Sequence, residues 1–240
     1  MDKLRHLEYF HLMSKLFHMF PLSIYATKLE FSSEQRQKLT QMILDDAKSR
    51  ETLVNKANKT WTGDVNGFEI LHDRQEFAFL FKEVSNHLRL YLDKLGVDHK
   101  LFDLYFTRSW GTIAKKGQNV SSHTHMQSHL SMVYYPCLPK NSGDLVFSIK
   151  DNLSEFIPGL LSVENMEKGI VKGSDIFAPN MLFKAEEDLL LIFPSKIGHA
   201  TEKSQSDDVR ISISSDINCV VKDSSGIEFF LPPLKQWRTF

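Results

Sequence analysis

The chain has 240 residues, and its 29 Lys and Arg almost balance its 30 Asp and Glu, giving a formal net charge of -1. This balance provides no basic footprint for nucleic acid or for a membrane surface, so we expect neither as a partner. The length suffices for one well-buried core, and no apolar run reaches transmembrane length. Only two cysteines occur, which favours a reducing cytoplasm over a disulfide framework.

Two helical patterns occupy residues 32–96. A helix is expected to begin at Ser32, because Ser32 and Gln35 have the spacing of a capping box and apolar residues follow on one stripe. A second helix is expected to open at Asp73 and to end at Gly96, whose residue type commonly terminates helices. We therefore expect residues 20–99 to form a helical buttress.

The remainder of the chain has the short apolar and alternating runs of β-strands, several of them bounded by Gly, Pro, Asn or Asp. Predicted strands cover residues 20–31, 101–110, 119–126, 129–136, 144–149, 188–194, 210–221 and 227–232. Helices followed by about seven strands favour an α+β layout, in which N-terminal helices buttress a double-stranded β-helix, or jelly roll.

We expect a single domain over residues 1–240. Residues 1–19 have apolar side chains at helical spacing and are predicted to form an N-terminal helical extension. The buttress over 20–99 precedes a jelly-roll core over 100–232. Within that core, residues 151–188 form a long stretch rich in Gly and Pro, which is the best candidate for a lid that excludes water from a site.

A group of histidines is the strongest functional signal in the sequence. His123 and His125 are two residues apart, so on a strand their side chains would point to one side of the sheet. His199 follows the apolar strand predicted over 188–194. A third imidazole beside the pair would complete one face of a metal's coordination sphere and leave the opposite face open for substrates.

An arginine follows the last of these histidines on another predicted strand. Arg210 and Ser212 alternate with isoleucines and therefore share one face. An arginine that faces into a barrel needs a partner, because a buried unpaired guanidinium is costly. A carboxylate held in a bidentate manner is the natural partner, so an anionic co-substrate is expected here.

These residues carry a family resemblance. The segments HTHMQSHLSMVYYP, IFPSKIGHATE and RISISSDI occur in order, and the chain resembles Fe(II)/2-oxoglutarate-dependent oxygenases of the jelly-roll superfamily. It is most similar to a group of bacterial and phage oxygenases with an H-x-H, H and R-x-S pattern. The resemblance spans about residues 20–220. It implies a non-haem iron dioxygenase that takes Fe(II) and 2-oxoglutarate and acts, with O2, on a small-molecule or peptide substrate.

The resemblance also implies roles for individual residues. His123, His125 and His199 would be the iron ligands and so the catalytic centre. Arg210 and Ser212 would bind 2-oxoglutarate. The tyrosine pair on the strand after the metal segment resembles that of prolyl-hydroxylase-type enzymes, whose second tyrosine reaches the co-substrate; here it is Tyr135. The expected reaction is hydroxylation of the substrate with release of succinate and CO2.

Two positions depart from the usual pattern. Most of the superfamily has a carboxylate at the position of His125. A neutral imidazole there makes the net charge of the iron site more positive by one elementary charge. All three imidazoles must be deprotonated to bind, so metal affinity should fall as the pH drops through about 6.5. Met132 replaces the glycine of the family's S-G-V-Y-Y run, so this bulky side chain should narrow the pocket or alter strand packing.

Two alternatives remain open from the sequence. A three-histidine cupin-like dioxygenase would bind its substrate directly on the metal without 2-oxoglutarate, but that pattern expects a glutamate after the H-x-H, where this chain has His129. A non-catalytic jelly roll would bind a partner and merely retain the histidines. His129 itself is expected to be an ordinary polar residue, with a further ligand as the alternative. The sequence predicts neither the prime substrate nor the oligomeric state.

Overall fold

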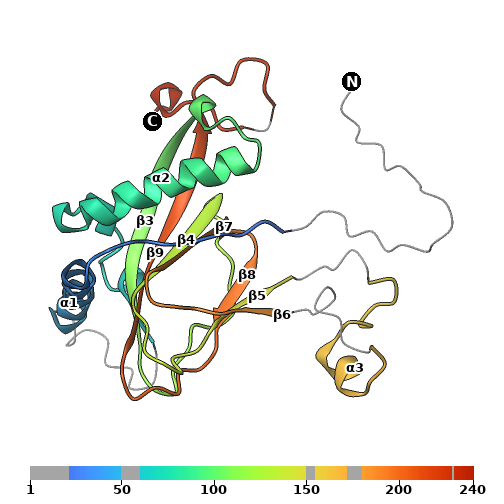
Figure 1. The fold of residues 1–240 in the computed structure, drawn as a ribbon. Helices are drawn as coiled ribbons and strands as arrows, with labels where there is room; N and C mark the ends of the chain where they lie inside the picture. Colours follow the sequence, from blue (N-terminus) through green and yellow to red (C-terminus); the bar gives the residue numbers. More distant parts are fainter. Residues whose placement is uncertain (1–21, 50–59, 150–154, 172–179, 229) are drawn as a thin grey trace.

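A computed structural model describes residues 22–49, 60–149, 155–171, 180–228 and 230–240. Two antiparallel sheets face each other, and the two long helices cover the outer face of the larger one (Figure 1). The predicted extension over 1–19 lies outside the described residues. Within these ranges, no helix is long and apolar enough to cross a membrane.

The larger sheet has six strands in the order β1-β7-β4-β9-β3-β2, and the smaller has three in the order β6-β5-β8. Their bounds are β1 Tyr25–Lys28, β2 Trp61–Thr62, β3 Phe102–Ala114, β4 Leu130–Cys137, β5 Leu145–Ser148, β6 Asn180–Phe183, β7 Leu189–Pro194, β8 Gly198–Thr201 and β9 Arg210–Val221. The described helices are α1 Ser33–Ser49, α2 Ala78–Lys94 and α3 Val163–Glu167, with short 3-10 turns at Gly63–Val65, Leu71–Asp73, Gln75–Phe77, His99–Leu101 and Leu234–Gln236.

Helix α1 begins as the capping box predicts. The Ser32 backbone N–H donates to Gln35 Oε1 at 2.9 Å, and the Gln35 N–H donates to Ser32 Oγ at 3.2 Å. Leu39 and Ile43 lie on the stripe that the sequence indicates, and both are fully buried against the larger sheet. The helix thus anchors on β3 and β4, which carry part of the site described below.

Alternation along β9 assigns its two faces. Ile211, Ile213 and Ile217 belong to the core beneath the helices, whereas Arg210 and Ser212 point into the space between the sheets. A second core cluster fills that space beyond the site, with Val133, Leu145, Phe147, Leu191 and Phe193 among its members. One sheet therefore separates an apolar helix-covered layer from an inner layer that is polar around the site.

Several predicted elements differ in the structure. The second helix begins at Ala78, because the Asp73 region forms two 3-10 turns first. Residues 119–126 contain an isolated bridge and no strand, and strand β8, which carries His199, has no counterpart in the prediction. Among the described residues of 227–232 there is no strand. The predicted lid segment contains α3 and β6.

The jelly roll buttressed by helices is confirmed. The sequence left open whether the Met132 side chain narrows the pocket or alters strand packing. This side chain is 1% exposed and packs in the helix-covered core, on the opposite side of β4 from Val133 and Tyr135. Its bulk therefore enters strand and helix packing.

Candidate metal centre

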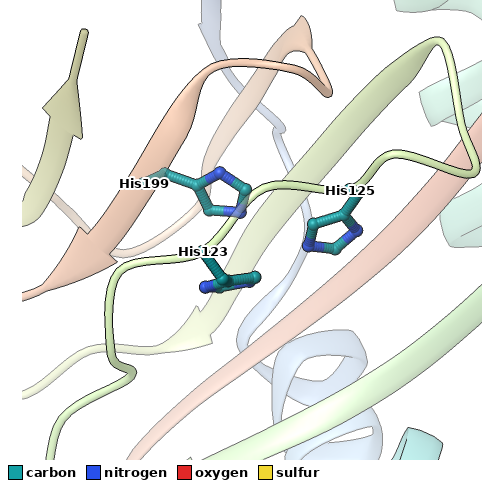
Figure 2. A group of neighbouring side chains, drawn as sticks. All are labelled: His123, His125 and His199. Atoms are coloured by element: carbon teal, nitrogen blue, oxygen red, sulfur yellow. The ribbon is translucent and has the colours of Figure 1, made fainter. Parts of the chain in front are cut away.

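Three histidines meet at one end of the space between the sheets. One nitrogen from each of His123, His125 and His199 lies within 4.8 Å of the others. Their ring centroids are 4.3 to 5.1 Å apart, and Figure 2 shows the three rings turned toward a common point. The structure therefore brings together all three histidines that the sequence selects, from two segments far apart in the chain.

Backbone hydrogen bonds hold these segments together. His123 and His199 form an isolated antiparallel bridge, in which each N–H donates to the other's carbonyl oxygen at 3.0 Å. The His125 N–H donates to the Ser195 carbonyl, also at 3.0 Å. The H-x-H segment thus lies along the free side of β8, where a further strand of the smaller sheet would be. The segment is not a strand, yet the side chains of His123 and His125 lie on the same side of it, as the two-residue spacing predicts.

The hydrogen bond that Nδ1 of each histidine makes determines which ring nitrogen can bind a metal. Nδ1 of His123 and Nδ1 of His199 lie 2.8 and 2.9 Å from the carbonyl oxygens two residues earlier in the chain. A carbonyl can only accept, so each Nδ1 carries the proton and Nε2 keeps its lone pair. His125 Nδ1 lies 2.5 Å from Asp216 Oδ1, which assigns the same role to its Nε2.

Burial favours the neutral form of the His199 imidazole. The pKa of His199 is lowered from its ordinary 6.5 to about 4, first because burial penalises the charged form, although its hydrogen bond to the Ile197 carbonyl partly opposes this. The neighbouring His123 and His125 lower it further. Three convergent imidazoles with fixed tautomers form a set of donors suited to a divalent transition metal, so the residues present fit iron.

A pocket of about 250 Å³ opens beside the histidines and extends to Arg210. The Arg210 side chain is 3% exposed, and its Nη1 donates to the carbonyls of Ser142 and Gly143 at 3.3 Å each. Among the described residues, no carboxylate lies within ion-pair distance of it. A buried guanidinium that lines a pocket without a carboxylate partner is suited to bind an anionic ligand.

The two adjacent tyrosines have different surroundings. Tyr134 faces the helices, and its hydroxyl donates to Asp188 Oδ1 at 2.8 Å. Tyr135 lines the pocket with its ring centroid 5.9 Å from the Arg210 guanidinium carbon. Ser212 lines the same pocket from β9. The three residues predicted to hold the co-substrate therefore lie together.

The opposite end of the pocket contains residues that the sequence did not indicate. The Trp110 ring stacks on His125 with centroids 5.6 Å apart, and the Arg108 guanidinium carbon lies 5.4 Å from the Trp110 ring. Arg108 Nη2 also pairs with Asp64 Oδ2 at 3.1 Å, while Asp64 Oδ1 is buried without a partner among the described residues. Only the alternation of Arg108 and Trp110 on one strand could have suggested this wall.

Asp216 is the other residue that sequence reasoning missed. It is fully buried and receives hydrogen bonds from His125 Nδ1, from Gln127 Nε2 at 3.0 Å and from Ser128 Oγ at 3.1 Å. Burial acts to raise its pKa, but these bonds and the nearby imidazole outweigh burial and lower it. Asp216 is an even number of residues from Arg210 and Ser212 on β9, so alternation could have placed it on the same face as these two residues.

His129 lies outside the histidine group. Its Nδ1 accepts a hydrogen bond from the Cys219 backbone N–H at 3.1 Å, and the ring is exposed. Within the described ranges, only His123, His125 and His199 form a cluster with metal-ligand spacing. His129 is thus an exposed polar residue directly before β4.

Comparisons with known proteins agree with this geometry. A family model described as "Putative 2OG-Fe(II) oxygenase" matches residues 108–216. This range contains all the predicted site residues. A search of curated proteins found no match.

Three solved structures resemble the fold. A prolyl-4-hydroxylase from Pseudomonas putida has 13% identity and a TM-score of 0.50, over 82% of this chain and 93% of that one. The α-ketoglutarate-dependent carbocyclase SnoK from nogalamycin biosynthesis has 10% identity and a TM-score of 0.52, over 88% of each chain. HygX from Streptomyces hygroscopicus, solved with nickel and 2-oxoglutarate bound, has 11% identity and a TM-score of 0.50, over 82% of this chain and 83% of that one.

The family match, the jelly roll and the three-histidine cluster lead to one assignment. They support the 2-oxoglutarate oxygenase interpretation over the cupin-like and non-catalytic alternatives. Over residues 108–216 the chain is similar to the 2OG-Fe(II) oxygenase family, and this similarity supports an enzyme that depends on iron and 2-oxoglutarate.

Proposed function

We propose that the chain is a dioxygenase that hydroxylates a small-molecule or peptide substrate, with iron held by Nε2 of His123, His125 and His199. The convergence of the three rings and the hydrogen bonds at each Nδ1 support these roles. Three ligands on one side of an ion leave the remaining positions open, as a non-haem oxygenase requires.

We assign the binding of 2-oxoglutarate to Arg210, Tyr135 and Ser212. The observation that carries this assignment is the buried Arg210 guanidinium, which lines the pocket and has no carboxylate partner among the described residues. The far carboxylate of the co-substrate would accept hydrogen bonds from the guanidinium and from the Tyr135 hydroxyl. Its other end would then point toward the histidines, since Arg210 and the histidines line the same pocket.

When bound, iron with 2-oxoglutarate supplies the oxidising chemistry: O2 is consumed, the co-substrate loses CO2 to become succinate, and one oxygen atom enters a substrate C–H bond. The protein contributes orientation and exclusion of water. Arg210 orients the co-substrate, and the apolar walls formed by Val133, Leu145 and Phe193 keep the inner end of the pocket dry.

The substrate is proposed to approach past Trp110, because the Trp110 ring stacks on His125 and lines the pocket. Trp110 would offer an aromatic face next to the metal, and Asp64 and Arg108 would offer polar contacts.

Cys137 and Cys219 are both free thiols, and we place the protein in the cytoplasm on that basis.

The test is O2-dependent conversion of 2-oxoglutarate to succinate by the iron-loaded protein, with no prime substrate added. Wild-type protein should form succinate slowly, and Arg210→Ala should reduce the rate at low 2-oxoglutarate concentration by a factor of roughly 100, as expected when one partner of a buried charge pair is removed. Equal rates in the two proteins, or no succinate from iron-loaded wild type, would contradict the proposal.

A further inference from the structure

Asp216 is a buried carboxylate for which the proposed function gives no role. Its exposed fraction is 0%, and its three hydrogen-bond donors, His125, Gln127 and Ser128, are groups that need carry no charge. A buried carboxylate is costly unless a cation compensates it. Nothing in the fold alone explains why an acid stands here.

The nearest arginine in the sheet does not compensate Asp216. Arg108 is its direct partner across β3 and β9, yet the guanidinium turns away to pair with Asp64 and to lie over Trp110. Among the described Lys and Arg residues, none lies within 4.0 Å of the Asp216 carboxylate. With His125 in the neutral form that metal binding through Nε2 requires, the remaining place for a positive charge is the metal that Nε2 would hold.

The third ligand of this site, His125, is an imidazole at the position where most of the superfamily that the sequence resembles has a carboxylate. With a divalent ion, three neutral imidazoles give a centre of charge +2, whereas two imidazoles and a carboxylate give +1. Asp216, one imidazole away at 2.5 Å from His125 Nδ1, brings the local sum back to +1. A carboxylate that accepts from Nδ1 also raises the basicity of Nε2 and fixes the orientation of the ring.

We infer that Asp216 is a positioning residue that replaces the missing carboxylate ligand from the second layer of the site, setting both the tautomer of His125 and the net charge of the metal centre. Gln127 and Ser128 hold the carboxylate in place through its two oxygens. The inference rests on the proposed function, because it takes His125 as a ligand. It concerns a residue outside the ligand set and outside the co-substrate pocket.

The test compares wild type, Asp216→Asn and Asp46→Asn by anaerobic titration with Co(II), read by its visible spectrum and by competition with a chelator. Asn keeps the size of Asp and an oxygen that can accept from His125 Nδ1 but removes the charge. Asp46 is a buried carboxylate paired with Arg74 at 2.6 Å in the helical layer, so Asp46→Asn controls for the loss of a buried acid.

We expect Asp216→Asn to weaken Co(II) binding by 10- to 100-fold and Asp46→Asn to leave it within twofold. Because the charge of the centre becomes more positive, the Co(II)-loaded Asp216→Asn protein should bind the dianion 2-oxoglutarate as tightly as wild type or more tightly. Unchanged Co(II) affinity in Asp216→Asn would overturn the inference. Parallel losses of Co(II) and 2-oxoglutarate affinity would also overturn it, in favour of a general structural role.

These outcomes separate the inference from the proposed function. If wild-type protein fails to bind Co(II) at all, the metal site itself is wrong and the proposed function fails with it. If wild type binds Co(II) and 2-oxoglutarate, and Asp216→Asn does so equally well, the proposed function stands and only the role of Asp216 is rejected. Circular dichroism of each variant before titration verifies that folded proteins are compared.

Discussion

His123 and His199 are joined by a pair of backbone hydrogen bonds, each 3.0 Å long, and their imidazole centroids lie 4.3 Å apart. Two ligands of the proposed metal centre are thus positioned by main-chain pairing before any metal binds. Such preorganisation reduces the conformational entropy that metal binding must overcome. The third, His125, is placed by its N–H bond to Ser195 and by Asp216.

The first prediction concerns the ligand set. His125→Ala should abolish stoichiometric Fe(II) binding, because the remaining pair of imidazoles supplies too few ligands at this site. His129→Ala is the matched control and should bind one Fe(II), since its ring accepts the Cys219 N–H and lies outside the histidine cluster. Metal analysis after anaerobic gel filtration measures both. Full iron content in His125→Ala would show that another residue is the ligand.

The adjacent tyrosines provide a second prediction. Tyr135→Phe should weaken 2-oxoglutarate binding by about 1 kcal/mol, the usual net contribution of one hydrogen bond, and should leave stability nearly unchanged. Tyr134→Phe should do the reverse, because its hydroxyl bonds Asp188 in the helix-covered layer. Calorimetric titration of the metal-loaded proteins and urea unfolding distinguish the two. Equal effects of both substitutions on 2-oxoglutarate affinity would contradict the proposed face of Tyr135.

The third prediction follows from the lowered pKa of His199. Its folded value of about 4 lies below the ordinary 6.5, so the unfolded chain binds more protons between these values. This group therefore stabilises the metal-free protein fully above pH 6.5, and the contribution is lost as the pH falls toward 4. Between pH 7 and pH 5 the difference in unfolding free energy between wild type and His199→Gln should decrease by roughly 2 kcal/mol.

Urea unfolding of the metal-free proteins at the two pH values measures this change. A chelator in every sample ensures that no bound metal contributes to the difference. A difference between wild type and His199→Gln that stays constant from pH 7 to pH 5 would show that His199 titrates normally in the folded state.

The fourth prediction tests how closely helix α1 lies on the sheet that supports the site. A Cβ at Gly111 would lie 2.4 Å from Ile43 Cδ1, so Gly111→Ala should destabilise the protein by about 1–3 kcal/mol through overpacking. Ile43→Val removes one methylene from the opposing side chain and should recover part of that loss in the double variant. If the two substitutions have additive costs in urea unfolding, the two residues are not in contact.

Much of the candidate site could be predicted because residue type and strand alternation, both local features of the sequence, identify its residues. The isoleucine alternation on β9 assigns Arg210 and Ser212 to one face, and the same rule separates Tyr134 from Tyr135. Residue type then suggested the partners: imidazoles for a metal and a guanidinium for a carboxylate. Those inferences need only the direction in which neighbouring side chains point.

The rest depended on contacts between segments distant in sequence. Strand β8 is four residues long and forms a strand because it pairs with β5. No local sequence pattern predicts this pairing. Asp216 lies among isoleucines and serines of β9, and its importance appears only when the loop with His125 folds over it. The 3-10 turns before α2 arise where Ser109 accepts a hydrogen bond from the His72 N–H, a contact made across 37 positions.

The most direct measurement of the central claim is anaerobic titration of the Fe(II)-loaded protein with 2-oxoglutarate, followed by visible absorption. Chelation of the metal by the co-substrate should produce a weak charge-transfer band that saturates at one 2-oxoglutarate per iron. Arg210→Ala should require a much higher 2-oxoglutarate concentration to give the same band. Saturating 2-oxoglutarate that gives no band with one iron bound per chain would contradict the account.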